Sequence, residues 1–310
     1  PGRPGPGPPR SGVGASPPDE CGLSWRPVTD VDSAVTAALG VAATTVERLG
    51  GGCISDASKV TLADGQVVFA KSGAGLPVGL LSVEAETLEW LRDAGGVSVP
   101  AVLSASDEVL ILEWIEPGNR TAATDERLGR GLAALHKAGA DSFGWHRDGF
   151  IGSIAQRNTP PSDEWPQFWL TRRIEPLARV AKERGALDPE ALDLIERLRG
   201  RIDDLAGPAE PPARVHGDLW SGNVHIDREG EPWLIDPAAY GGHREVDLAM
   251  LHLFGAPAPA VVDAYNEAFP LADGWQERLR LWQLEPLLTH AVMFGGSYGG
   301  SARATLARFT

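Results

Sequence analysis

The sequence is poor in cysteine and in positive charge, and it has no long apolar run. Its 310 residues include only two cysteines, Cys21 and Cys53, too few for a disulfide framework, which favours a reducing compartment such as the cytoplasm. Lysine and arginine number 28 against 42 aspartates and glutamates, a formal net charge of −14 that argues against nucleic acid or an anionic membrane as the main partner. Because no apolar stretch approaches about eighteen residues, we predict no transmembrane helix.

Residues 1–28 differ in composition from the rest of the chain. They are mostly proline, glycine and serine, and they lack the charged start and apolar stretch of a signal peptide. Such a segment cannot bury enough apolar surface to offset the entropy lost on ordering. We therefore expect residues 1–28 to form a disordered leader.

Short apolar segments separated by turn signals fill residues 29–115. Asp64-Gly65 is a strong hairpin signal, because both residue types tolerate turn conformations. The pattern predicts helices at 29–39 and 78–94 and strands at 41–49, 59–62, 67–71, 99–102 and 109–113. We expect a mostly antiparallel sheet with one long helix.

Helical periodicity dominates residues 116–310. Leu128, Leu132 and Leu135 mark one helix, and further helical patterns cover 163–182, 188–204, 246–254, 258–268 and 275–293. Short apolar pieces separated by loops lie between Arg214 and Asp236. A β-rich lobe followed by a helical lobe with a small inserted sheet is an α+β arrangement.

The strongest chemical signal is the run His216-Gly-Asp218-Leu-Trp-Ser-Gly-Asn223, followed by Ile235-Asp236-Pro237. Phosphoryl transfer needs a carboxylate near the accepting hydroxyl and oxygen ligands for Mg²⁺. The H-x-D-x-x-x-x-N spacing assigns Asp218 as the catalytic base, with Asn223 and Asp236 as the metal ligands. Two protein ligands suffice, because phosphates and water complete the Mg²⁺ shell. Each piece alone is more often an ordinary turn or strand end, but their order and spacing together favour a kinase.

Residues upstream of this run fit a nucleotide site for ATP. Lys71 ends an apolar strand, as expected for a lysine that reaches the phosphates, and Glu84 on the next helix is its expected ion-pair partner, with Glu86 as the competitor. Each would otherwise be a solvated surface charge.

Two loops complete the predicted nucleotide site. The loop 50–55 links the first two strands and contributes Gly51, Gly52 and Ser55, although it matches neither a GxGxxG nor a Walker A pattern. The segment Glu113-Trp114-Ile115 follows the fifth strand and would form an interlobe hinge that offers backbone groups to adenine. Residues 29–115 are thus the predicted nucleotide-binding N-lobe, and 116–310 the catalytic and acceptor-binding C-lobe.

The segment after Asp236-Pro237 is short. Only a few residues separate it from the run His243-Arg-Glu-Val-Asp247, which leaves no room for the long activation segment of protein kinases. This favours a small-molecule acceptor over a folded protein substrate.

At this point the sequence resembles a known family. HGDLWSGN at 216–223, IDPAAYGGHREVDLAM at 235–250, AYNEAFPL at 264–271 and FGGSY at 294–298 are similar to the fructosamine kinase (ketosamine-3-kinase) family, a branch of the aminoglycoside phosphotransferase-like kinases. The resemblance covers roughly residues 30–305. It implies a protein-kinase-like two-lobed fold and ATP-dependent, Mg²⁺-dependent phosphorylation of the 3-hydroxyl of a ketosamine, either a small molecule or protein-bound, as a deglycation repair step.

The resemblance also implies roles for further residues. Asp247 is the acidic residue that supports the loop holding His216 and Asp218, while Cys53 in the nucleotide loop is a candidate redox-sensitive position or simply a small residue tolerated there. Candidates for the acceptor pocket are His243, Tyr240, Arg173 and Trp169. For Tyr240 and Trp169 core packing is an equally good interpretation, and His243 fits a structural histidine equally well.

Two alternatives stay open at this level. Another kinase of the same superfamily would act on an aminoglycoside, choline or a sugar alcohol. A nucleotide-binding pseudokinase would serve as a sensor or scaffold, but every catalytic position expected of an active kinase is present in the sequence.

Overall fold

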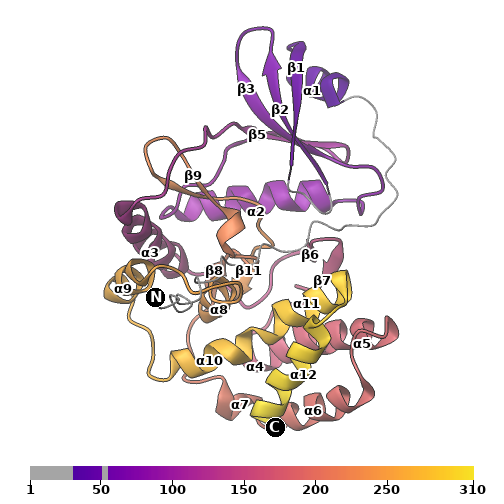
Figure 1. Cartoon of the computed structure of the whole chain (residues 1–310), viewed down its shortest axis with the longest axis vertical. Helices are drawn as coiled ribbons and strands as arrows, with labels where there is room; N and C mark the ends of the chain where they lie inside the picture. Colours follow the sequence, from indigo (N-terminus) through magenta and orange to yellow (C-terminus); the bar gives the residue numbers. More distant parts are fainter. Residues whose placement is uncertain (1–30, 51–54) are drawn as a thin grey trace, which may run out of the picture.

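The structure, a computed structural model, describes residues 31–50 and 55–310. Figure 1 shows a lobe of strands above a larger lobe of helices, which matches the predicted α+β two-lobed architecture. The predicted leader at 1–28 and the loop residues Gly51, Gly52 and Cys53 lie outside the described residues. Their assignments stay predictions.

The N-terminal lobe is a five-stranded sheet with two helices. Its strands follow the order β1-β2-β3-β5-β4, and every neighbouring pair is antiparallel. The elements are α1 (Val31–Leu39), β1 (Ala43–Leu49), β2 (Asp56–Leu62), β3 (Val67–Ser72), α2 (Leu80–Ala94), β4 (Val102–Ala105) and β5 (Val109–Glu113). The predicted antiparallel sheet with one long helix is therefore confirmed.

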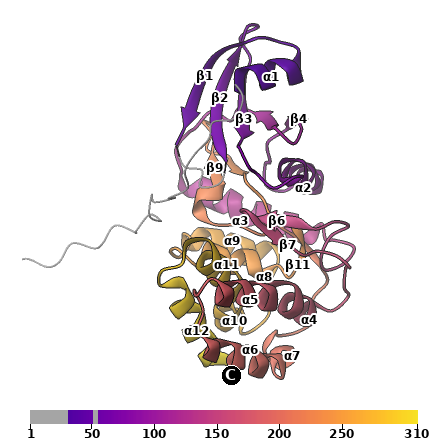
Figure 2. The ribbon, with the colours of Figure 1, turned by 90° about the vertical axis from the view of Figure 1, so that its right-hand side faces the viewer.

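Strand β5 is buried on both faces, because each face of the sheet is covered by a different helix. Val109 and Ile111 pack in a small core with Val35 of α1. Leu110 and Leu112 alternate with them and join the large core, which includes Leu88 of α2. The continuous apolar run of β5 follows from this double burial, and α2 is thereby held against the sheet at the interlobe side (Figure 2).

The predicted strand at 99–102 is wrong in its position, since β4 begins only at Val102. Pro100 has no N–H to donate to a ladder, which disfavours a strand across it. The preceding segment pairs with the other lobe instead: Ser98 forms an isolated bridge to Trp233, and its carbonyl accepts a hydrogen bond from the N–H of Leu234. This contact ties the sheet lobe to the helical lobe.

The C-terminal lobe consists mainly of helices, as predicted. They are α3 (Ala122–Lys137), α4 (Trp165–Trp169), a π-helical segment (Leu170–Ile174), α5 (Glu175–Glu183), α6 (Pro189–Arg199), α7 (Ile202–Leu205), α8 (Glu245–Leu251), α9 (Pro259–Ala268), α10 (Trp275–Trp282), α11 (Leu284–Phe294) and α12 (Tyr298–Phe309). The single helix predicted at 275–293 is two helices, because Pro286 cannot donate a hydrogen bond to the carbonyl of Trp282. The terminal helix α12 was not predicted.

Three pairs of short strands join these helices. β6 (Gly149–Ile151) pairs with β7 (Ile154–Gln156), β8 (Ala213–Val215) with β11 (Tyr240–Gly242), and β9 (Val224–Ile226) with β10 (Pro232–Leu234). The loop 216–223 begins where β8 ends and runs into β9, directly beneath the sheet lobe. Over the ranges that the structure describes, no helix combines the length and apolarity required to cross a bilayer.

Candidate active site

Lys71 joins the two lobes through carboxylates. Its ammonium group lies 2.8 and 2.7 Å from the two carboxylate oxygens of Glu84 on α2, and 3.0 Å from Oδ1 of Asp236, which follows β10. Burial opposes the charge on Lys71, but the two carboxylates outweigh it and raise the pKa of Lys71 above its ordinary value. The lysine is therefore a fixed positive charge. Glu86, the competitor for its partner, pairs with His146 and Arg147 instead.

The loop after β8 is held by Asp247 of α8. Its Oδ2 accepts a hydrogen bond from the backbone N–H of His216 at 2.7 Å, and its Oδ1 accepts one from Gly217 at 2.9 Å. The ring of His136 on α3 lies 3.2 Å from the same Oδ2. These contacts hold the pKa of Asp247 low although burial works against its charge, so the carboxylate is a permanent acceptor.

The first two residues of this loop have demanding geometry. Gly217 has a φ of +81°, and a Cβ there would come within 2.2 Å of the carbonyl oxygen of Ala238. The ring of His216 bridges the loop, because its Nε2 donates to the carbonyl of Ile235 and its Nδ1 accepts from the N–H of Asp218. Burial lowers the pKa of His216, which keeps this neutral form with one donor and one acceptor. His216 is thus a structural link between the two halves of the site.

Asp218 and Asn223 face each other across the loop. The Nδ2 of Asn223 donates to the backbone carbonyl of Asp218 at 2.9 Å and to its Oδ2 at 3.2 Å. Both hydrogen bonds use the amide nitrogen, so neither occupies the side-chain carbonyl oxygen of Asn223. The loop conformation therefore fixes the orientation of the Asp218 carboxylate.

Asp236 has an unusual backbone. Among the non-glycine residues that the structure describes, it is the one with a positive φ, 53°. Strained backbone of this kind concentrates at functional sites, where surrounding contacts enforce it. This backbone conformation places the carboxylate of Asp236, in the helical lobe, against Lys71 of the sheet lobe.

The two aspartates have opposite pKa shifts. Burial and the neighbouring charge of Asp236 raise the pKa of Asp218 to about 7. Burial also opposes the charge of Asp236, but Lys71 outweighs it and holds the pKa of Asp236 below its usual range. Two carboxylates with pKa values pushed apart are suited to different tasks. Asp218 can exchange a proton near neutral pH, whereas Asp236 stays anionic.

A cavity of about 280 Å³ opens over these groups. One end is polar and includes Ser55 and the side chains of Lys71, Glu84, Asp218, Asn223 and Asp236. Apolar residues line another part of the cavity: Phe150 and Ile151 of β6, Trp220 of the loop 216–223, Phe254 after α8, and Met293 and Phe294 of α11. We call these six residues the apolar wall. The cavity that contains Asp218 is therefore lined both by charged side chains and by an apolar wall.

The predicted hinge is not part of the lining of this cavity. Glu113 ends β5 and pairs with Val68. Trp114 donates its Nε1 hydrogen to Glu116, and the carbonyl of Ile115 accepts a hydrogen bond from His225 at 3.1 Å. The carbonyl of Ile115 thus already has a partner, while the roles of Glu113, Trp114 and Ile115 in binding adenine stay predictions.

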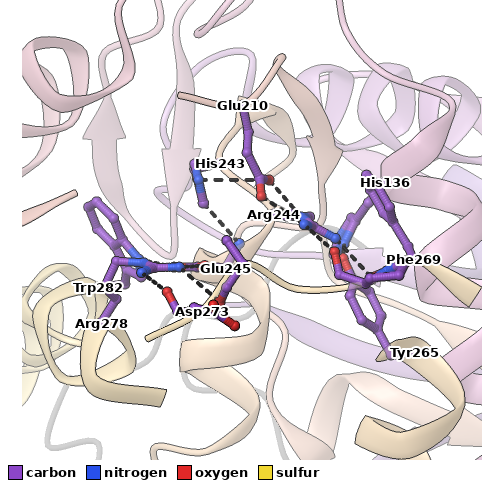
Figure 3. A network of polar contacts seen from close by, with 12 residues as sticks. His136, Glu210, His243, Arg244, Glu245, Tyr265, Phe269, Asp273, Arg278 and Trp282 are labelled. Atoms are coloured by element: carbon purple, nitrogen blue, oxygen red, sulfur yellow. Dashed lines mark hydrogen bonds and ion pairs between the residues drawn. The ribbon is translucent and has the colours of Figure 1, made fainter. Parts of the chain in front are cut away.

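Three of the predicted acceptor residues are buried in the helical lobe. His243 is 3% exposed and stacks on Trp282, with ring centroids 5.7 Å apart, in the buried network of Figure 3. Arg173 and Trp169 are also core residues: Arg173 bonds Asn158 and Glu285, and Trp169 packs edge-on against Trp282. These three residues are absent from the lining of the 280 Å³ cavity, and their role in the acceptor pocket stays a prediction.

Tyr240 is likewise absent from the lining of the 280 Å³ cavity. Tyr240 is buried under the guanidinium of Arg173 and borders a smaller cavity of about 30 Å³ that also touches Asp218. Most residues of the apolar wall were missed, because they come from β6, from the segment after α8 and from α11, which no motif connects to the loop 216–223. Trp220 of the HGDLWSGN run and Phe294 of the FGGSY motif were the local signals for this wall.

Figure 3 also shows how α8, which carries Asp247, is anchored. Arg244 forms two bonds of 2.6 and 2.7 Å with Glu210 and donates to the carbonyls of Phe269 and Pro270. Glu245, which is fully buried, accepts from Arg278 at 2.9 and 2.6 Å and from Trp282 at 2.8 Å. We refer to these contacts of Arg244 and Glu245 as the α8 clamp. It fixes the start of the helix through Arg244 and Glu245, three and two residues before Asp247.

The two-lobed fold, the lysine–carboxylate pair and the aspartates of the cavity define an ATP-dependent kinase. The fructosamine kinase family model matches residues 27–310. A protein described as a probable ketoamine kinase from Enterococcus faecium is 36% identical over 245 residues, 78% of this chain and 87% of its own length. The chloroplastic protein-ribulosamine 3-kinase of Arabidopsis thaliana is 32% identical over 273 residues, covering 85% of this chain and 82% of that protein.

A solved structure agrees with this family. A Thermobifida fusca protein assigned as a fructosamine-3-kinase superimposes with a TM-score of 0.85 at 44% identity, covering 91% of this chain and 99% of that one. The chain therefore belongs to the fructosamine kinase family, and the resemblance found in its motifs is confirmed.

Proposed function

We propose that the protein transfers the γ-phosphoryl group of ATP to the 3-hydroxyl of a ketosamine, the adduct of a sugar with an amine. The observation that carries this proposal is the position of Asp218, a carboxylate with a pKa of about 7, in one cavity with the charged side chains of Lys71 and Asp236 and with the apolar wall. Family membership directs the choice of acceptor. The relatives include a kinase named for protein-bound ribulosamine, which supports this class of acceptor.

Asp218 acts as the base in this reaction. The 3-hydroxyl oxygen attacks the γ-phosphorus, the bond from phosphorus to the β,γ-bridging oxygen breaks, and ADP leaves. The hydroxyl proton passes to Asp218, whose Oδ1 is the oxygen not bonded to Asn223. A carboxyl pKa near the working pH lets this group take up the proton and release it again. Asp247 contributes by holding the N–H groups of His216 and Gly217.

The phosphates would be bound at the polar end of the cavity. Lys71, held by Glu84, is a fixed cation that can bind phosphate oxygens. When ATP is bound, Lys71 would contact the phosphates as well as Asp236.

The donor set of Asp236 and Asn223 fits Mg²⁺. The ion prefers oxygen ligands and usually takes one or two from the protein. Asp236 is anionic, and the side-chain oxygen of Asn223 is not used by its two hydrogen bonds. In the part of the chain that the structure describes, no cluster of three or more histidine, cysteine or acidic side chains forms a closed cage, which is in keeping with a metal shared with phosphates. Bound Mg²⁺ would neutralise phosphate charge.

The test is ATP turnover against a panel of acceptors. Purified protein is assayed for ADP release with ribulosamines, erythrulosamines, fructosamines, an aminoglycoside and choline, with and without Mg²⁺. We expect turnover with ketosamines and a product that phosphorus NMR shows to be phosphorylated at O3. The Asp218→Asn variant is the matched control for contaminating kinases. Turnover of the aminoglycoside or choline without any ketosamine would refute the proposal.

A further inference from the structure

The motif AYNEAFPL at 264–271 lies away from the reaction site. The structure describes all eight of its residues, and none of them lines the 280 Å³ or the 30 Å³ cavity. The motif covers the second half of α9 and the residues after it. The carbonyls of Phe269 and Pro270 accept hydrogen bonds from Arg244, and the side chain of Tyr265 enters the buried network of Figure 3. The motif therefore contacts the support of α8 and no described cavity.

Helices α3 and α9 pack closely enough for Tyr265 to reach His136. At Gly129 of α3, a Cβ would come within 2.2 Å of the carbonyl oxygen of Val261 and 3.0 Å of the backbone nitrogen of Tyr265. His136 follows about two turns later on the same face of α3. The hydroxyl of Tyr265 lies 2.8 Å from Nδ1 of His136, and both side chains are buried. This contact is therefore fixed by the packing of two helices.

The hydrogen bonds from Arg244 to Asp247 run in one direction. The carboxylate of Asp247 accepts, so Nε2 of His136, 3.2 Å from its Oδ2, carries the hydrogen. At the other end Arg244 can only donate, and it interacts with the hydroxyl of Tyr265 through its charge and a hydrogen bond. The hydroxyl hydrogen of Tyr265 is then left for Nδ1 of His136. Because the partner of one ring nitrogen decides which nitrogen is protonated, Tyr265 holds His136 in the tautomer that donates to Asp247.

The donor on His136 matters for the orientation of the Asp247 carboxylate. Its Oδ2 accepts from the ring of His136 and from the N–H of His216, while its Oδ1 accepts from Gly217. Without the ring donor the carboxylate can turn, and both backbone N–H groups would move with it. Asp218 follows directly in the chain, and a displacement of about 1 Å at a reacting group can cost about 10²-fold in rate.

We propose that Tyr265 and His136 are positioning residues for phosphoryl transfer, which act on the loop 216–223 through Asp247. This inference rests on the proposed function. Tyr265 sets the tautomer of His136, the ring of His136 orients the carboxylate of Asp247, and the carboxylate holds the backbone next to Asp218. The motif at 264–271 is thus the distal support of the catalytic loop.

The experiment is a double-mutant cycle in kcat, with a ribulosamine as acceptor. Tyr265→Phe removes only the hydroxyl, so kcat should fall about ten-fold while the KM values of ATP and the acceptor change by less than about two-fold. His136→Gln places an amide N–H near the position of Nε2 and has no tautomer to be fixed, so it should keep kcat within about three-fold of the wild type. Adding Tyr265→Phe to His136→Gln should then have no further effect, whereas a purely structural role of Tyr265 would lower kcat equally in both backgrounds.

A second measurement detects the tautomer directly. Nitrogen–proton correlation spectra of isotope-labelled protein distinguish a ring protonated on Nε2 from one protonated on Nδ1, and the signals of His136 are assigned by their loss in His136→Gln. We expect hydrogen on Nε2 in the wild-type protein and a mixture of tautomers in Tyr265→Phe. Tyr298→Phe is the matched control, because it keeps the ring that packs against His290 and also loses only a hydroxyl. It should leave kcat and the signals of His136 unchanged.

The outcomes separate this inference from the proposed function. If the wild-type protein phosphorylates no ketosamine, the proposed function fails and the inference falls with it. If it is active but His136 carries its hydrogen on Nδ1, if Tyr265→Phe keeps the wild-type kcat, or if the two substitutions lower kcat independently, the ketosamine assignment stands and the positioning role is refuted. A rise in KM in place of the fall in kcat would refute it equally. If Tyr265→Phe is too unstable to assay, the tautomer in the wild-type protein decides.

Discussion

The ionised carboxylate of Asp218 reduces the stability of the folded protein, and an Asp218→Asn substitution should remove that cost together with the activity. The pKa of this group rises from 3.8 to about 7 on folding, because burial and the charge of Asp236 disfavour ionisation. Between these pH values the unfolded chain has released the proton while the folded protein retains it. The stability of the wild-type protein therefore falls as the pH rises from about 4 to about 7, and it stays low above that.

The size of this effect follows from the shift. At about 1.4 kcal/mol per pKa unit, a shift of about three units corresponds to about 4 kcal/mol. Asp218 lies on an open cavity where water screens its charge, so we take about half, roughly 2 kcal/mol at pH 8. With an unfolding entropy of about 2.1 cal/mol/K per residue over the 310 residues, the asparagine variant should melt about 3 °C higher than the wild-type protein. Its kcat should fall by about 10²–10⁴-fold, as for loss of a general base.

The assay is thermal unfolding of both proteins at pH 8 and at pH 4.5, with ATP turnover measured in parallel at neutral pH. The gain in Tm should be present at pH 8 and largely absent at pH 4.5, where the wild-type carboxyl group is protonated. Asp227→Asn is a control of opposite sign, because Asp227 accepts hydrogen bonds from Trp233, Glu229 and Glu231 and its pKa is lowered although burial opposes its charge. A lower Tm for Asp218→Asn at pH 8, or kcat above a third of the wild-type value, would refute the reasoning.

Two further substitutions test the remaining parts of the site. Asp236→Asn should abolish the tightening of ATP binding by Mg²⁺ while keeping the backbone, because asparagine tolerates a positive φ; calorimetric titrations with and without Mg²⁺ measure this, and an unchanged Mg²⁺ dependence would exclude Asp236 as a ligand. Asp247→Asn should cost about 1–3 kcal/mol in denaturant unfolding, because one of the N–H groups of His216 and Gly217 would face an amide nitrogen that cannot accept. Its kcat should fall as well, whereas the exposed Asp263→Asn should change neither quantity.

The sequence could predict those parts of the fold and the site that depend on local residue patterns. Alternation of apolar residues and the Asp64-Gly65 turn predict the sheet, and the fixed spacing between Asp218 and Asn223 marks the loop that carries them. Lys71 and Glu84 could be paired because a strand and the helix after it place them on facing surfaces, and the two charges do meet.

The acceptor side could not be predicted in this way, because burial depends on the whole fold. His243 follows Asp236 closely in the sequence, yet its ring is packed against Trp282, which lies on a helix much later in the chain. Conversely, Phe254 and Phe294 have no special spacing and meet at the cavity only because α8 and α11 fold back on the loop. Proximity in the chain was thus the basis for assigning His243, and within the wall of the cavity only Trp220 and Phe294 belong to a sequence motif.

The α8 clamp has a consequence for how the protein is made. Glu245 is fully buried, and its carboxylate accepts hydrogen bonds from Arg278 and Trp282 of α10. Helix α10 is synthesised after the loop 216–223. A buried carboxylate without its partner is strongly unfavourable, so α8 cannot reach its final position while α10 is missing. Nascent chains fold from the amino terminus, which gives the sheet lobe time to form first. The enzyme therefore acquires a competent catalytic loop only after α10 has been synthesised.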